Sequence, residues 1–129
     1  LGGSGQVGSP AVLAGATIAP GDREASGALT VNGDLALGEN AIYAWHADGA
    51  TGDVVDVSGQ LTVPNRLRVN ANILTGGWQD GITLFTFGSV AGDTSRIGSW
   101  PVTGAAAYAA LEPGRIVLRR QTAFYFLIQ

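Results

Sequence analysis

The sequence has no cysteine, no methionine and no lysine, and its only histidine is His46. A chain without cysteine forms no disulfide, has no thiol nucleophile and offers no thiolate to a metal ion. One histidine is too few for a zinc site, and no aspartate-rich loop of the calcium-binding kind is present, so we expect no metal and no cofactor. Since methionine is absent, Leu1 is not an unprocessed start, and we expect a processed chain or a fragment whose targeting segment is gone.

Charge is also scarce. Charged residues make up 13% of the sequence, against about 25% in an average domain, and the net charge is −3. Without a basic cluster, neither nucleic acid nor an anionic membrane surface is an expected partner. Apolar runs stay shorter than the about 18 residues of a membrane span, so we expect no span. The basic residues are all arginine and are scattered along the chain: Arg23, Arg66, Arg68, Arg96, Arg115, Arg119 and Arg120.

The sequence contains 20 glycine residues and many short segments in which apolar and polar residues alternate. Glycine weakens helix interiors, whereas alternation of apolar and polar residues is typical of strands bounded by turns. Residues 29–37 and 55–63 share the pattern apolar-x-Val-x-Gly-x-Leu-x-apolar, displaced by 26 residues. An internal repeat of this length indicates a β-solenoid, while two similar hairpins in a β-sandwich are the alternative. Either arrangement makes the chain an all-β protein.

The rest of the chain continues the same pattern. Strands are predicted at residues 66–73, 82–87, 106–111, 115–119 and 122–128, and residues 89–99 are predicted to form a loop. No proline-rich or charged linker divides the sequence, so we expect a single domain over residues 1–129.

The two ends of the chain are candidates for self-association. Residues 122–129 are apolar on both faces of the predicted strand, which therefore needs cover on both sides. The cover comes either from the core of the same domain or from a neighbouring copy, to whose sheet edge the strand would add. The glycine-rich residues 2–8 permit close approach of another backbone. The candidate self-association residues are Leu1, Gly2, Gly3, Val7, Phe124, Tyr125, Phe126, Leu127 and Ile128.

The residues that could carry out catalysis do not form a recognisable set. His46 has Asp48 close by in the sequence, but no Gly-x-Ser-x-Gly nucleophile elbow accompanies it. Asp48, Asp53 and Asp56 could form the paired carboxylates of a glycosidase. Aspartate in loops more often stabilises turns, and we prefer that interpretation. We therefore expect that the chain is not an enzyme.

Aromatic side chains offer a possible binding surface. Tyr43 and Trp45 share one face of the strand predicted around residues 42–47, opposite Ile42 and Ala44. Packing in the core or under loops is the expected role of most aromatic residues, because they bury large areas and keep one polar group. Tyr43 and Trp45 are nevertheless the best candidates for an exposed patch that stacks on a glycan or a cell surface.

Several stretches occur in the order found in one known family. They are residues 1–10, residues 16–21, Gly27–Leu37, Tyr43–Trp45, Asp53–Val63, Ile82–Gly88, and Tyr108 with Gly114–Leu118. In this respect the chain resembles the C-terminal passenger region of exported bacterial proteins with autotransporter-associated β-strand repeats. The resemblance implies a right-handed parallel β-helix, export past the inner membrane, and an extracellular or cell-surface location. It does not imply catalysis. We expect a few rungs, with an antiparallel cap at the C-terminal end.

Three functions from different classes remain, in this order of preference. The first is a structural protein that self-assembles through solenoid ends or terminal strands into a fibre, sheath or surface layer, because open sheet edges pair and head-to-tail contacts build filaments. This function predicts a homo-oligomer or polymer. The second is an adhesive or glycan-binding module displayed on the cell surface. The third is a polysaccharide-acting enzyme, which would need clustered carboxylates in a groove.

Overall fold

The structure is a computed structural model that describes residues 5–8, 11–12, 15–20, 27–49 and 51–121. Nearly all of its regular elements are β-strands, and the only helix in the described part is a short 3-10 helix, η1 (Thr94–Ser99). The prediction of an all-β protein is confirmed.

The strands form three sheets. In spatial order, the first sheet contains β1 (Gly5–Gly8), β4 (Ala28–Asn32), β8 (Val54–Val57), β11 (Ile82–Thr86), β15 (Arg115–Arg120) and β14 (Ala107–Glu112). The second contains β12 (Ser89–Gly92), β9 (Gln60–Val63), β5 (Leu35–Leu37) and β2 (Ala11–Val12). The third contains β13 (Val102–Thr103), β10 (Arg68–Trp78), β6 (Ile42–Gly49) and β3 (Thr17–Ile18), with the short β7 (Thr51–Gly52) paired to β6.

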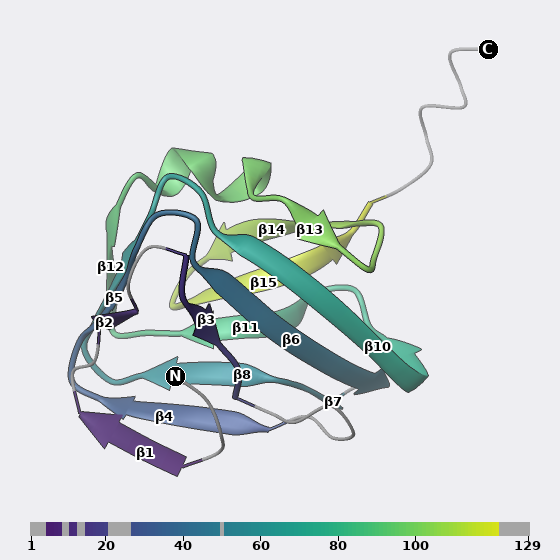
Figure 1. The fold of residues 1–129 in the computed structure, drawn as a ribbon, viewed down its shortest axis with the longest axis horizontal. Helices are drawn as coiled ribbons and strands as arrows, with labels where there is room; N and C mark the ends of the chain where they lie inside the picture. The colour runs from purple at the N-terminus through teal and green to yellow at the C-terminus, as the bar shows by residue number, and fades with distance from the viewer. Residues whose placement is uncertain (1–4, 9–10, 13–14, 21–26, 50, 122–129) are drawn as a thin grey trace.

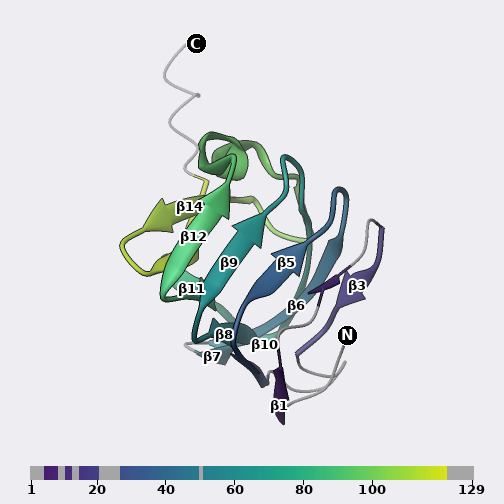
Figure 2. The same ribbon diagram turned by 90° about the vertical axis from the view of Figure 1, so that its left-hand side faces the viewer.

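Pairing between the successive strands of each sheet is mostly parallel, and the chain visits the three sheets in turn. After β4, β5 and β6 it returns to the first sheet with β8 and repeats the order through β9 and β10 (Figures 1 and 2). Leu29 is the register partner of Val55, and Leu35 that of Leu61. The two copies of the 26-residue pattern therefore lie side by side. Two hairpins of a β-sandwich would instead pair consecutive strands antiparallel.

An antiparallel unit ends the described chain. Strands β14 and β15 form a hairpin that turns at Gly114, whose φ is 76°, and β15 pairs antiparallel with β11. The helix η1 packs near β14 and buries Ile97 in the core, and Trp100, which follows the helix, is buried there too. Figure 1 shows η1, β13 and β14 at the end of the molecule opposite β1 and β4.

One core receives apolar side chains from all three sheets. Buried and less buried residues alternate along strands such as β4, where Leu29 and Val31 are buried while Thr30 is not. Each fully buried Leu, Ile or Phe contributes about 1.5–3 kcal/mol relative to exposure. The largest fully buried side chains are Trp45, Tyr43, Phe85, Ile18, Leu29, Leu35, Leu61, Leu67, Leu84, Ile97, Ile116 and Leu118.

Contacts at the corners between sheets hold neighbouring turns of the chain in register. The carboxylate of Asp34 accepts a hydrogen bond of 2.8 Å from the backbone N–H of Gln60. Glu39 accepts in the same way from Asn65 and Arg66, at 2.9 and 3.2 Å. The glycine of the repeat has a steric role here, because a Cβ on Gly59 would lie 2.3 Å from Asp34 Oδ1.

Candidate functional site

An open hollow with a volume of 370 Å³ lies between β8 and the turn that joins β10 to β11. It is on the side of the first sheet that faces away from the core, because Val54 in its wall alternates with the buried Val55. This volume is at the lower end of the about 300–1,000 Å³ usual for small-molecule sites. Its lining residues are Gly52, Val54, Gln79, Asp80, Gly81, Ile82, Thr83 and Thr86.

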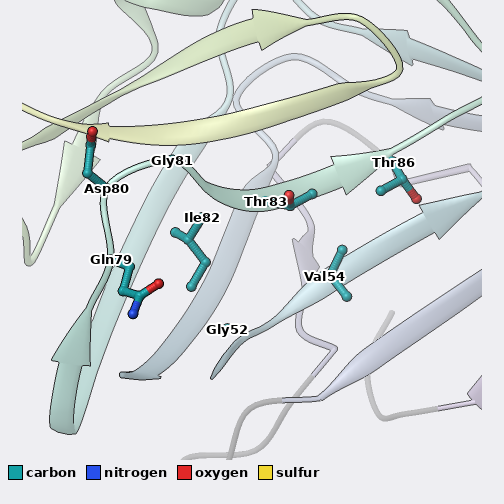
Figure 3. Close-up of a pocket in the computed structure, with 8 residues that line it drawn as sticks. All are labelled: Gly52, Val54, Gln79, Asp80, Gly81, Ile82, Thr83 and Thr86. Atoms are coloured by element: carbon teal, nitrogen blue, oxygen red, sulfur yellow. The ribbon is translucent and has the colours of Figure 1, made fainter. Parts of the chain in front are cut away.

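The walls of the hollow differ in chemistry. Figure 3 shows Gln79 and Ile82 on one side, with Val54, Thr83 and Thr86 on the other. Gly52 forms part of the base and has to be small, because a Cβ there would lie 2.7 Å from the terminal methyl of Ile82 and 3.1 Å from the ring of Trp45. The hollow thus combines two aliphatic side chains with one amide and two hydroxyl groups.

The two threonines are oriented by neighbouring charged residues. The guanidinium of Arg115 donates to the Thr83 hydroxyl oxygen at 3.1 Å. The Thr86 hydroxyl donates to Asp56 at 2.6 Å. A hydroxyl carries one donor and two acceptor positions. Thr83 can therefore still donate to a ligand, and Thr86 can still accept.

An ion-pair network fixes the turn above the hollow. Asp80, which points away from the hollow in Figure 3, accepts the backbone N–H of Arg120 at 2.6 Å and lies 3.6 Å from Arg119. Glu112 is hydrogen-bonded to Arg119 and lies 2.8 Å from Arg115. Each of these acidic side chains is therefore balanced by a guanidinium group.

The network also sets the protonation of its members. Loss of solvation by itself would raise the pKa of Glu112, but the hydrogen bond and charge of Arg119, together with Arg115, outweigh it and lower that pKa. The hydrogen bond and charge of Glu112 raise the pKa of Arg119 in return. Both side chains are therefore charged at neutral pH.

Polar side chains extend from the hollow across the first sheet. Thr30, Asp56, Thr86 and Arg115 are register partners on successive strands, and Arg115 is opposite Glu112 on β14. Because residues in register share a face of the sheet, these side chains form one continuous polar row.

Trp78 directly precedes Gln79 of the hollow, and its ring contacts both Arg120 and Trp45. The guanidinium of Arg120 is 4.4 Å from the Trp78 ring centroid and also donates to the Trp78 carbonyl oxygen at 2.7 Å. The ring of Trp45 meets Trp78 edge-on, with centroids 6.4 Å apart. Trp78 therefore supports the β10 end of the hollow and joins it to the core.

A second polar cluster, centred on Asp53, is buried. The Asp53 carboxylate accepts the backbone N–H of Gly27 at 2.6 Å and that of His46 at 2.9 Å, and it lies 2.8 Å from Nδ1 of His46. Asp53 is fully buried and His46 is 8% exposed. Among the described residues, no hydroxyl is hydrogen-bonded to the His46 ring.

The expectation that Tyr43 and Trp45 form an exposed patch is wrong, because both are 0% exposed. They do share one face of β6, but it is the face that packs into the core. Their polar tips bind backbone groups there: the Tyr43 hydroxyl lies 2.9 Å from the Leu84 carbonyl oxygen, and Trp45 Nε1 donates to the Asp53 carbonyl oxygen at 2.9 Å. Burial, with the charges of Asp53 and Asp56, raises the pKa of Tyr43 well above its usual value.

The three aspartates considered as paired carboxylates have different environments. Asp53 is inside the protein, Asp56 binds Thr86 on the outer face of the first sheet, and Asp48 is exposed near the end of β6. Asp53 is therefore more than a turn residue, which the sequence analysis did not foresee.

The candidate self-association residues are mostly outside the described residues: Leu1, Gly2, Gly3, Phe124, Tyr125, Phe126, Leu127 and Ile128. Val7 lies in β1 in register with Val31 of β4, and β1 is the edge strand of the first sheet.

The lining of the hollow was missed by the sequence analysis. Asp80 and Gly81 are typical of a turn, and Thr83 and Thr86 lie in the strand predicted at residues 82–87, so neither pattern indicates a binding site. Comparison with models of known protein families, with curated proteins and with solved structures finds no match. Over the described ranges, no helix has the length and hydropathy to cross a membrane, and no three His, Cys, Asp or Glu side chains gather as a metal site would require.

Proposed function

We propose that this chain is an exported structural protein that self-assembles at the cell surface or outside the cell. In this proposal the three sheets are the faces of a right-handed parallel β-helix of a few rungs, and the β14–β15 hairpin is its antiparallel cap. Export and location rest on the resemblance to autotransporter-associated passenger regions.

The observation that carries the proposal is the position of the first three strands. Among the described residues, β1, β2 and β3 are each the last strand of their sheet. Edge strands offer unpaired backbone N–H and C=O groups along one side, and these groups pair readily with a further strand. In this proposal these three strands together offer an edge on all three sheets to a neighbouring copy.

The opposite end is less suited to such pairing. There η1 packs near β14, and Ile97 and Trp100 are buried in the core. The antiparallel β15 pairs with β11 in place of a further parallel strand, and β14 is the outer strand of the first sheet. Simple stacking of one open end on another open end would give only dimers, so a polymer needs a second joint.

Residues 122–129 are the proposed second joint. One residue separates them from the end of β15 at Arg120, and they read Thr-Ala-Phe-Tyr-Phe-Leu-Ile-Gln. A strand that is apolar on both faces is suited to adding to a sheet edge where further side chains cover it. Addition of this segment to the β1 edge of the next copy is a head-to-tail contact that does not close, and such contacts build filaments.

Electron microscopy and sizing of the native chain, at dilute concentration and moderate salt, test the proposal. We expect ordered filaments or sheets. The variant with Phe124→Lys and Phe126→Lys should not assemble, whereas the matched control Gln121→Lys, at the exposed residue before the segment, should assemble as the parent does. A stable monomer of 13.1 kDa for the parent chain would overturn the proposal.

A further inference from the structure

The hollow beside β8 has the chemical character of a site for a small, polyhydroxylated molecule. A sugar ring has apolar C–H patches on its faces and hydroxyl groups around its edge. The hollow offers Val54 and Ile82 as aliphatic surface and Gln79, Thr83 and Thr86 as polar groups around it (Figure 3). Sites that bind such molecules combine apolar walls with a few placed polar groups in this way.

The polar groups are complementary in their hydrogen-bonding capacity. The Gln79 side chain is exposed, makes no hydrogen bond to a described residue, and supplies both a donor and an acceptor. Because Arg115 donates to Thr83, the Thr83 hydroxyl proton is free to donate. Because Thr86 donates to Asp56, its oxygen can accept. Each sugar hydroxyl both donates and accepts, so it can match any of the three.

The charges around the hollow favour a neutral molecule. Asp80 is turned toward Arg119 and the backbone of Arg120, and Arg115 lies against Glu112. Asp56 is engaged by the Thr86 hydroxyl. A charged ligand would have to compete with these contacts, whereas a neutral one uses only the hydroxyl and amide groups that face the hollow.

We infer that this hollow binds one neutral sugar residue, either free or as a unit of a glycan chain. A free sugar is small, and the hollow is open on one side, so we expect a dissociation constant on the order of 1 mM. The inference does not depend on self-assembly, because the hollow is built entirely from β7, β8, β11 and the β10–β11 turn.

The test is a titration of the isotope-labelled chain, followed by amide NMR signals, with neutral hexoses, an uncharged oligosaccharide and a uronic acid. The assembly-blocked variant Phe124→Lys with Phe126→Lys keeps the sample soluble if the parent assembles. Neutral sugars should shift the signals of Gln79 to Thr83 saturably. Tighter binding of the oligosaccharide than of its monomer would indicate that the ligand is a glycan chain. Equal binding of the two would indicate that the ligand is a free sugar.

Variants separate this site from weak contacts elsewhere. Gln79→Ala combined with Thr83→Val should weaken binding about tenfold or more. The matched controls Gln60→Ala and Thr103→Val, on the second and third sheets, should leave it unchanged. Gly52→Ala should also weaken it, since its methyl group would push Ile82 toward the hollow. Thermal unfolding of each variant shows whether it is folded.

Three outcomes would overturn the inference. The first is the absence of saturable shifts with every neutral sugar. The second is shifts that persist unchanged in the folded double variant. The third is binding confined to the uronic acid, because that would mean a charge is recognised.

Discussion

The carboxylate of Asp53 lies 2.8 Å from Nδ1 of His46, and it also accepts the backbone N–H of His46 at 2.9 Å. The same side chain of Asp53 accepts the N–H of Gly27, which belongs to the preceding turn of the chain, at 2.6 Å. One buried side chain thus connects β6 to the start of β4, and its removal would leave one buried and one partly buried backbone donor without this partner.

Replacement of Asp53 should therefore destabilise the protein strongly. We expect Asp53→Ala to lower the free energy of unfolding by about 3 kcal/mol or more, since unsatisfied buried donors and a lost charged partner each cost energy. Denaturant unfolding measures the change. The control Asn72→Ala, at the exposed register partner of His46, should change stability by less than about 0.5 kcal/mol. Equal stability of the two variants would contradict this role for Asp53.

Glycine at the corner of the repeat should not tolerate a side chain. A Cβ on Gly59 would lie 2.3 Å from Asp34 Oδ1 and 2.7 Å from the Gly33 carbonyl oxygen. Because the second of these is backbone, Gly59→Ala should cost about 1–3 kcal/mol. The matched control is Gly98→Ala, where the nearest atom would be 3.9 Å away. Thermal unfolding of both variants checks the prediction, which fails if they melt together.

The buried hydroxyl of Tyr43 should limit stability at high pH. Burial and the charges of Asp53 and Asp56 raise the pKa of Tyr43 in the folded protein. A raised pKa means that folding favours the neutral form, so this contribution is present below the unfolded pKa of about 10 and is lost as pH rises above it. Tyr43→Phe should therefore reduce the loss of stability above about pH 10. Denaturant unfolding of parent and variant at several pH values above and below about 10 measures the difference.

The same variant has a cost at neutral pH. Loss of the contact to the Leu84 carbonyl oxygen should lower the free energy of unfolding by about 1 kcal/mol. Tyr108→Phe, at a side chain that is 43% exposed, is the control and should have little effect. A Tyr43→Phe variant that loses stability at high pH as steeply as the parent would count against this assignment.

The ion pairs of Glu112 should stabilise the folded protein at pH values above the usual pKa of this side chain, and this stabilisation should be lost at low pH. The folded pKa of Glu112 is lowered, so the stabilisation is present above the usual value of 4.5 and disappears as pH falls through the folded pKa. Glu112→Gln should flatten this part of the pH profile, and high salt should reduce the difference because the side chains involved are exposed to solvent. Melting temperatures of parent and variant at several pH values and two salt concentrations provide the measurement.

The sequence pattern predicted where strands lie better than it predicted which face of each strand is buried. Alternation and the glycine repeat placed residues 29–37 and 55–63 correctly, since stacked neighbours must share the same inward positions. Alternation also placed Tyr43 and Trp45 on one face, but it does not say which face is inside. Residues 89–99 were predicted as a loop, but they form β12 and η1. Val90 packs against the core and Ile97 is buried in it, and these tertiary contacts are not visible in the local sequence.

The two polar clusters depend on long-range contacts. Asp53 is hydrogen-bonded to Gly27, which is 26 positions earlier in the sequence, and in the hollow Gly52 lies against Ile82. A single sequence shows only local turn and strand patterns at these positions, because the partners become neighbours only after the sheets have formed. Residues with such partners can be identified from sequence only when the register of the whole sheet is known.

The corner contacts of Asp34 and Glu39 suggest how a fold of this kind could grow. Each carboxylate reaches backbone N–H groups about 26 residues further along, in the next turn of the chain. An insertion of one residue would move every side chain of the next strand to the opposite face. Duplication of a whole 26-residue unit would instead recreate the donor, the acceptor and the glycine together. Duplications of whole 26-residue units should therefore be tolerated in this protein, whereas insertions of part of a unit should be selected against.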